Sequence, residues 1–328
     1  MDVILDVLVF GLKAGLVVAA FALIAGLGAK AAKDKLQQDG KIKVTKISDR
    51  LSSYHKSIDK ALLSEDDFQT KWKGVKPIVK PNRLFVIDFD GDIEASEVEF
   101  LREEVTSVIA TGCNSDKVLI RIKSGGGTVD GYGLVASQIH RLKDAGFFVT
   151  VSVDRVAASG GYMAAVVADE IIAAPFSYIG SIGVIGQVPN IHKLLKSKGV
   201  EIEQHTAGEF KRTLTTMGET TDKARDKFKQ DLERMHKHFQ EHITRYRPEI
   251  DINKVSTGEV WNGLEALDLK LIDGVKVSDD FIGESLDSFE VVEIRYEPPK
   301  NPNTVLSSLL EQVVFKPVAK LVNTKILA

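Results

Sequence analysis

From residue 83 onward, segments with the hydrophobic pattern of a strand alternate with segments that have the pattern of a helix. Apolar residues gather in short runs at 83–93, 117–124, 147–154 and 170–175, which is typical of strands. Between these runs, residues 94–110, 131–146 and 160–169 are expected to be helical. Strands that alternate with helices in this way predict an α/β fold with a largely parallel sheet covered by helices.

The N-terminus has a different pattern. Residues 3–28 contain only two charges, Asp6 and Lys13, and residues 14–29 contain none. Since about 20 apolar residues cross a bilayer as a helix, residues 1–28 are predicted to form a transmembrane anchor. A buried core helix and a cleaved signal peptide are the alternatives. A signal peptide normally begins with basic residues, whereas Asp2 and Asp6 come first here.

The remaining boundaries follow from charge and proline. Residues 29–80 are predicted to be a charged, partly helical linker, which ends near Pro77 and Pro81. Six lysines against two aspartates at 30–46 favour a cytoplasmic location for the body, because positive flanks stay on that side. Residues 81–297 form the predicted compact domain. Residues 298–328 form a tail, expected to be helical, whose apolar face would lie on a neighbouring copy, the body or membrane lipid.

Composition excludes several classes of site. The formal net charge of −3 gives no signal for nucleic acid binding, and Cys113 is the single cysteine, so no intramolecular disulfide can form. The segment 220–247 is predicted to be one helix with charge on most faces. Its histidines are therefore expected to be solvated, and neither a metal site nor a cofactor is predicted.

Two glycine-rich loops follow predicted strands, where α/β proteins place their ligands. In "VAASGG", Ser159 is a candidate nucleophile at a strand-to-helix turn, and the alternative is a helix N-cap serine. In "KSGGGTVDG", the glycines lack a phosphate-loop ending. This loop could present backbone N–H groups to an oxyanion or a peptide, or it could be a flexible turn.

A nucleophilic serine needs a base. Among the histidines, only His192 and His205 lie where a base is plausible, and neither has an evident partner. Lys211 is the other candidate, on a polar loop with several threonines. The alternative for Lys211 is an ordinary surface charge.

Taken together, "KSGGG", "VAASGGYMAA", "APFSYIGSIGV" and "HTAGEFKRTL" resemble, in this order, the signal peptide peptidase A family of membrane serine peptidases (peptidase family S49). The resemblance spans residues 80–297 with the N-terminal anchor and linker. It implies a fold like that of Clp protease and crotonase, built from repeated ββα units. It also implies a serine–lysine dyad, with Ser159 as nucleophile, Lys211 as general base and Ser181 orienting the lysine.

The family's oxyanion hole corresponds to the N–H of Gly160 and to that of Gly126 or Gly127. The family usually has S-P-G-G at this loop, whereas this chain has Ser124 followed by three glycines, which predicts a less rigid loop.

The resemblance further implies an endopeptidase of the bacterial inner membrane that acts on peptides or unfolded proteins, with a preference for small side chains. It implies a homo-oligomer, in which some family members combine the serine and lysine of adjacent subunits. Two alternatives use the same fold: an acyl-CoA enzyme of the crotonase type, and a non-catalytic membrane scaffold with a peptide groove.

Overall fold

A computed structural model describes residues 40–74 and 80–299. Residues 42–295 form one compact unit, and the other unit comprises residues 1–41 and 296–328. The strands are β1 (Lys41–Lys46), β2 (Asn82–Gly91), β3 (Lys117–Ser124), β4 (Phe148–Val153), β5 (Val156–Ala158), β6 (Glu170–Ala173), β7 (Tyr178–Gly180), β8 (Val260–Asn262), β9 (Gly274–Val275) and β10 (Phe289–Glu297). The helices are α2 (Ile47–Leu62), α3 (Glu65–Trp72), α4 (Val98–Thr111), α5 (Val129–Asp144), α6 (Gly160–Ala165), α7 (His192–Ser197), α8 (Asp222–Tyr246), α9 (Ile252–Val255), α10 (Gly263–Asp268) and α11 (Ser278–Ser285).

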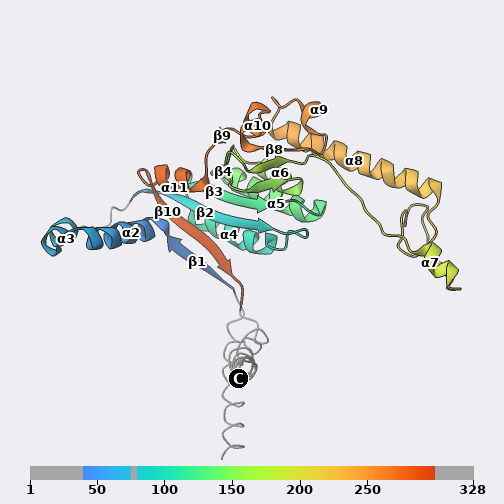
Figure 1. The fold of residues 1–328 in the computed structure, drawn as a ribbon, viewed down its shortest axis with the longest axis horizontal. Coiled ribbons are helices and arrows are strands. Elements are labelled where there is room, and N and C mark those ends of the chain that lie inside the picture. The colour runs from blue at the N-terminus through green and yellow to red at the C-terminus, as the bar shows by residue number, and fades with distance from the viewer. Residues whose placement is uncertain (1–39, 75–79, 300–328) are drawn as a thin grey trace, which may run out of the picture. The chain divides into compact units, whose positions relative to one another are not determined.

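The fold is mixed α/β, as the sequence predicts, with one sheet in the order β1-β10-β2-β3-β4-β6-β9 (Figure 1). Neighbouring strands from β10 to β9 run parallel. A branch leaves this sheet beside the end of β3: β5 pairs with β3 and with β7, both in parallel, and β7 pairs with β8 antiparallel. This branch positions the two serines considered below.

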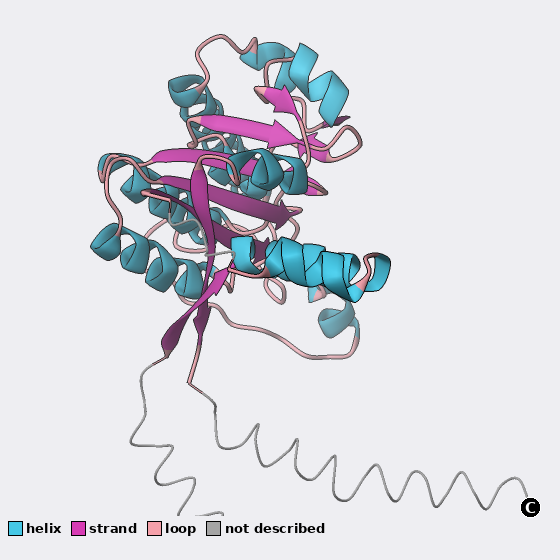
Figure 2. Cartoon of the chain, turned by 90° about the vertical axis from the view of Figure 1, so that its left-hand side faces the viewer, coloured by secondary structure: helices cyan, strands magenta, loops and turns pink. Residues whose placement is uncertain are grey.

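Both faces of the sheet are buried, and helices lie on both sides of it (Figure 2). In β2, Phe85, Ile87 and Phe89 join the larger core with α4 and α5, because alternate residues of a strand point to opposite faces. Leu84 and Val86 join a smaller core on the other face, which includes residues of α2 and α11.

Most predicted elements match the observed ones, with shifts at their ends. The strand predicted at 117–124 is β3, and the polar helix predicted at 220–247 is α8. The helix predicted at 160–169 is shorter, because α6 ends at Ala165. Residues 41–62, within the predicted charged and partly helical linker, form β1 and the helix α2, and Ile47 is buried in the smaller core.

The predicted anchor at residues 1–28 and the predicted tail at 304–327 lie outside the described residues. Within 40–74 and 80–299, none of the helices is long and apolar enough to cross a bilayer.

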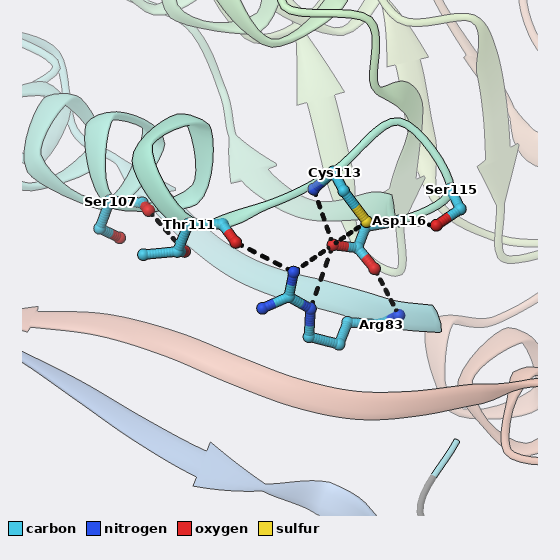
Figure 3. A network of polar contacts seen from close by, with 6 residues as sticks. All are labelled: Arg83, Ser107, Thr111, Cys113, Ser115 and Asp116. Atoms are coloured by element: carbon cyan, nitrogen blue, oxygen red, sulfur yellow. Dashed lines mark hydrogen bonds and ion pairs between the residues drawn. The ribbon is translucent and has the colours of Figure 1, made fainter. Parts of the chain in front are cut away.

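A buried carboxylate, Asp116, fastens the start of β2 to the start of β3 (Figure 3). It accepts hydrogen bonds from the backbone N–H of Arg83 at 2.7 Å, from its Nη2 at 2.6 Å and from the backbone N–H of Cys113 at 3.0 Å. Burial alone would raise the pKa of Asp116, but these hydrogen bonds outweigh it and hold the pKa below its ordinary value of 3.8. Asp116 therefore stabilises the fold as a carboxylate.

We expect Asp116→Asn to lower the free energy of unfolding of the full chain by about 2–4 kcal/mol at pH 7, because it leaves Arg83 without its charge partner. Since the pKa is depressed in the folded state, this contribution is fully present above pH 3.8 and is lost as the pH falls through the folded-state pKa. Denaturant unfolding at pH 7 and at pH values below 3.8 measures the difference.

Glu99→Gln is the matched control, because Glu99 pairs with Arg102 on an exposed face of α4. An exposed pair contributes at most about 1 kcal/mol. Equal losses for the two variants at pH 7 would contradict the role assigned to Asp116.

Candidate active site

Ser159 and Ser181 follow two paired strands directly. Strands β5 and β7 run parallel with Ala158 opposite Gly180, so the next residues, Ser159 and Ser181, are neighbours at the same sheet edge. The Ser159 N–H donates to the Gly180 carbonyl at 2.7 Å, and adjacent strands lie about 4.8 Å apart. The structure thus brings together two residues that are 22 positions apart in the sequence.

Ser159 has a backbone conformation that non-glycine residues rarely adopt. Its φ is +51° and its ψ is −118°, and Ser181 shares the φ of +51°. Such a conformation costs about 1–3 kcal/mol and persists only where the surroundings enforce it. Ser159 precedes α6, yet its side chain makes no capping hydrogen bond. The N-cap alternative therefore does not account for this serine, whose side chain lines a cavity.

The triple-glycine loop lies against Ser159. A Cβ at Gly126, whose φ is +90°, would lie 2.7 Å from the Gly160 nitrogen and 2.7 Å from the Ser159 Cβ. A Cβ at Gly127 would lie 2.0 Å from the carbonyl oxygen of Ile93, whereas one at Gly125 would meet nothing within 4 Å. Close approach of the backbone therefore requires glycine at 126 and 127 but not at 125.

The backbone N–H groups of these glycines are used differently. Gly126 donates to the Ser124 Oγ at 3.0 Å. Within the described residues, no hydrogen-bond acceptor pairs with the N–H of Gly127 or of Gly160. Gly127, Gly160 and Ser159 all line the same cavity. Two unused donors therefore belong to residues that line the same cavity as Ser159.

Hydrogen bonds hold the loop in the absence of the family's proline. Ser124 is buried, and its Oγ accepts from Gly126 and contacts the hydroxyl of Tyr132. The Tyr132 hydroxyl donates to the Asp92 carbonyl at 2.7 Å, which fixes the loop to the end of β2. No local sequence pattern predicts this network, because it depends on the side chains of Ser124 and Tyr132, which meet only in the folded chain.

The cavity at Ser159 has a volume of about 1090 Å³. It lies between α5, α6 and α8, and its walls include Ala136, Met163, Val167 and Phe239. This volume is far larger than the predicted preference for small side chains requires. Three histidines that the sequence analysis set aside as solvated or polar also line it: His140, His238 and His242. The i, i+4 spacing of His238 and His242, which Tyr246 continues along the same face of α8, was a signal for two of them, whereas His140 lies on α5.

Lys211 does not line the cavity at Ser159. It is exposed, in the loop between α7 and α8. The preceding residues hold this loop to the first turns of α8: Glu209 pairs with Lys223, and Phe210 lies under the ammonium groups of Lys223 and Lys227. The cavity meets α8 only from Met235 onward, which is about 12 Å along the helix from Lys227. One chain thus leaves Lys211 apart from Ser159.

The two candidate histidine bases also lie outside the cavity lining. His205 is largely exposed and lies 3.5 Å from a Glu203 oxygen. The Nδ1 of His192 donates to the Met217 carbonyl at 3.1 Å. Within residues 40–74 and 80–299, no cluster of three or more histidine, cysteine or acidic residues could hold a metal ion.

Relatives of this chain are proteases by name. The chain is 49% identical over 218 residues to a "Probable protease SohB" of Haemophilus influenzae, which covers 66% of this chain and 62% of the relative. It is 54% identical over 199 residues to the protein of the same name in Buchnera aphidicola subsp. Schlechtendalia chinensis, which covers 61% of this chain and 65% of the relative. The chain therefore spans less than two thirds of the length of these curated relatives.

Among solved structures, a serine mutant of the membrane-bound stomatin-specific protease 1510-N matches with a TM-score of 0.43 and 16% identity, covering 63% of this chain and 86% of that one. The model of the peptidase family S49 N-terminal region matches residues 2–139, and the model of peptidase family S49 matches residues 141–291. These adjoining matches, with relatives about 50% identical, show that the chain belongs to peptidase family S49.

Proposed function

We propose that this chain is a membrane-anchored serine endopeptidase with a Clp protease-like fold, in which Ser159 is the nucleophile and Lys211 the general base. The carrying observation is the strained Ser159 in the lining of a cavity that Gly127 and Gly160, with their two unused N–H groups, also line. Membership in peptidase family S49 supports the reaction class.

In the proposed reaction, the Ser159 Oγ attacks the carbonyl carbon of a peptide bond while the Nζ of Lys211 takes the hydroxyl proton. The carbonyl oxygen becomes an oxyanion that accepts from Gly160 and Gly127. The C–N bond then breaks, and the leaving amine takes the proton from Lys211. Water attacks the resulting ester, with Lys211 again taking a proton, and releases the acid and Ser159.

For the oxyanion we assign Gly127 rather than Gly126. The Gly126 N–H already donates to Ser124, so its use would require breaking that bond. Gly126 instead supports the site through its close approach to Ser159 and Gly160.

We further propose that Lys211 reaches Ser159 from a neighbouring copy in a homo-oligomer. The loop of Lys211 packs on the first turns of α8, away from the cavity of its own chain. A lysine acts as a general base only as the neutral amine. Burial against a second copy, close to Ser159 and without a carboxylate partner, favours the neutral amine. Ser181, beside Ser159, is suited to orient this amine.

A fluorophosphonate probe tests the reaction class. We expect it to label the full chain on Ser159 and to leave Ser159→Ala unlabelled, because only an activated serine reacts. Labelling of both proteins, or of neither, would contradict an active serine at residue 159.

The scaffold alternative predicts no labelling. The acyl-CoA alternative needs a carboxylate near the loops. Asp144 is the only acidic residue in the cavity lining, and it pairs with His140 at the end of α5.

For the membrane, we propose that residues 1–28 anchor the chain in the bacterial inner membrane, on the ground of their uncharged stretch at 14–29. The full chain should stay in the membrane fraction after alkaline carbonate extraction, whereas a chain that begins at residue 40 should be released. Recovery of the full chain in the soluble fraction, with its N-terminus intact, would contradict the anchor.

A further inference from the structure

The cavity that Ser159 lines extends along α5. Its lining follows one face of this helix, from Val129 beside the glycine loop to Asp144, a span of about 22 Å. On the α6 side, Met163 and Val167 contribute to the wall. His242 joins the wall from α8, and its ring contacts the Met163 carbonyl. A substrate side chain that runs along α6 from Ser159 would therefore meet His242 beside Met163.

His242 presents an unused hydrogen-bonding atom. Its Nε2 lies 2.9 Å from the Met163 carbonyl oxygen, and since a carbonyl only accepts, Nε2 carries a hydrogen. In the neutral ring, the lone pair then belongs to Nδ1. Within the described residues, Nδ1 has no hydrogen-bond partner. It is also not one of the fully buried polar atoms that lack a partner, so a substrate group can reach it. The half-buried ring thus offers one free acceptor.

The depth of His242 limits which side chains can reach it. Met163 lies one helical turn after Ser159, since its N–H donates to the Ser159 carbonyl at 2.9 Å. Four residues of helix correspond to about 6 Å. Alanine or valine beside the attacked carbonyl would end short of His242, whereas glutamine or glutamate could extend to it.

We propose that His242 is a specificity-determining residue. It forms a hydrogen bond with the side chain of the substrate residue whose carbonyl group Ser159 attacks. When neutral, its Nδ1 accepts a hydrogen bond from an uncharged donor such as a glutamine amide. When protonated, its Nδ1–H donates to a carboxylate such as glutamate. This inference rests on the proposed peptidase function.

The surroundings favour the neutral ring and leave the protonated ring without a carboxylate. Burial lowers the pKa of His242 below its ordinary value of 6.5, the hydrogen bond to Met163 opposes this, and the charge of Arg245 adds to it. The other titratable or charged groups of the cavity lining are His140, Arg141 and Asp144 from α5, with His238 and Tyr246 from α8; α6 contributes only the Met163 carbonyl. Asp144 already pairs with His140 at 2.9 Å. A substrate carboxylate would therefore be the partner of protonated His242.

The test uses the full chain in detergent and two peptides that differ only in glutamine or glutamate before the scissile bond. In the ratio of their kcat/KM values, the pH dependence of any group that affects both reactions equally cancels, including that of the general base. From pH 8 to pH 5.5, where the glutamate side chain remains ionised, we expect the glutamine-to-glutamate ratio to fall about tenfold, as one charge-assisted hydrogen bond replaces a neutral one.

His242→Gln keeps a donor for the Met163 carbonyl but does not titrate, so its ratio should stay constant over this range. His55→Gln, on the exposed face of α2, is the matched control and should keep the wild-type ratio. A wild-type pH dependence in His242→Gln would overturn the proposal. An equal loss of kcat/KM toward both peptides in His242→Gln would also overturn it, because that result indicates that His242 only supports the fold.

A binding measurement separates this proposal from the proposed function. In Ser159→Ala, fluorescence anisotropy gives the affinities of the same two peptides without hydrolysis. If the wild-type chain hydrolyses neither peptide, the peptidase proposal fails. A pH-dependent affinity ratio that His242→Gln abolishes would still support His242 as the determinant, and a constant ratio would overturn it.

Discussion

Ser159→Ala is expected to reduce peptide hydrolysis by at least about a thousandfold, because it removes the only atom that can form the acyl-enzyme. The fold should be unchanged, since the Ser159 side chain makes no capping hydrogen bond and its N–H keeps its bond to Gly180. The kcat/KM for a peptide, with the far-UV circular dichroism spectrum and the melting temperature, measures both expectations.

Two further substitutions sharpen this test. Ser159→Gly should be equally inactive but more stable than Ser159→Ala by about 1 kcal/mol, because glycine adopts a φ of +51° without strain. Ser181→Ala should lose less activity, because Ser181 is assigned to orienting the base. Near-normal kcat in Ser159→Ala would show that another residue is the nucleophile.

Lys211→Ala should cause a loss as large as that of Ser159→Ala, because no other group would take the serine proton. Lys198→Ala is the matched control, since Lys198 is also an exposed lysine of the segment that follows β7. His205→Ala and His192→Ala should retain most activity, because neither histidine lines the cavity. The assignment is wrong if Lys211→Ala stays active while His205→Ala does not.

Local residue patterns predicted the glycine-rich site but not its surroundings. Strand β3 and the loop after it were predictable because a buried apolar run and three glycines are local signals. Strands β5 and β7 have three residues each, which is too few to show the alternation of a strand. The sequence therefore did not predict that β5 and β7 pair and bring Ser159 next to Ser181. For these two serines, the resemblance to a family supplied what periodicity could not.

The charges of α8 explain two other differences. Helix α8 carries charge on most of its faces, so a solvated helix was the natural prediction for its histidines. In its C-terminal part, Phe239 and Ile243 join the main core, and His242 beside them lines the cavity. The N-terminal turns hold the loop of Lys211 instead. No local pattern reveals which part of a polar helix will be covered.

We propose that one active site combines Ser159 of one chain with Lys211 of another. A mixture of the two inactive variants, Ser159→Ala and Lys211→Ala, tests this proposal. Chains that are dissociated together and reassembled should regain about one quarter of the wild-type activity, because half of the chains carry the serine and half of their neighbours carry the lysine. Each variant treated alone should stay inactive. A mixed assembly, verified by two different tags, that remains inactive would contradict the claim and require both residues to meet within one chain.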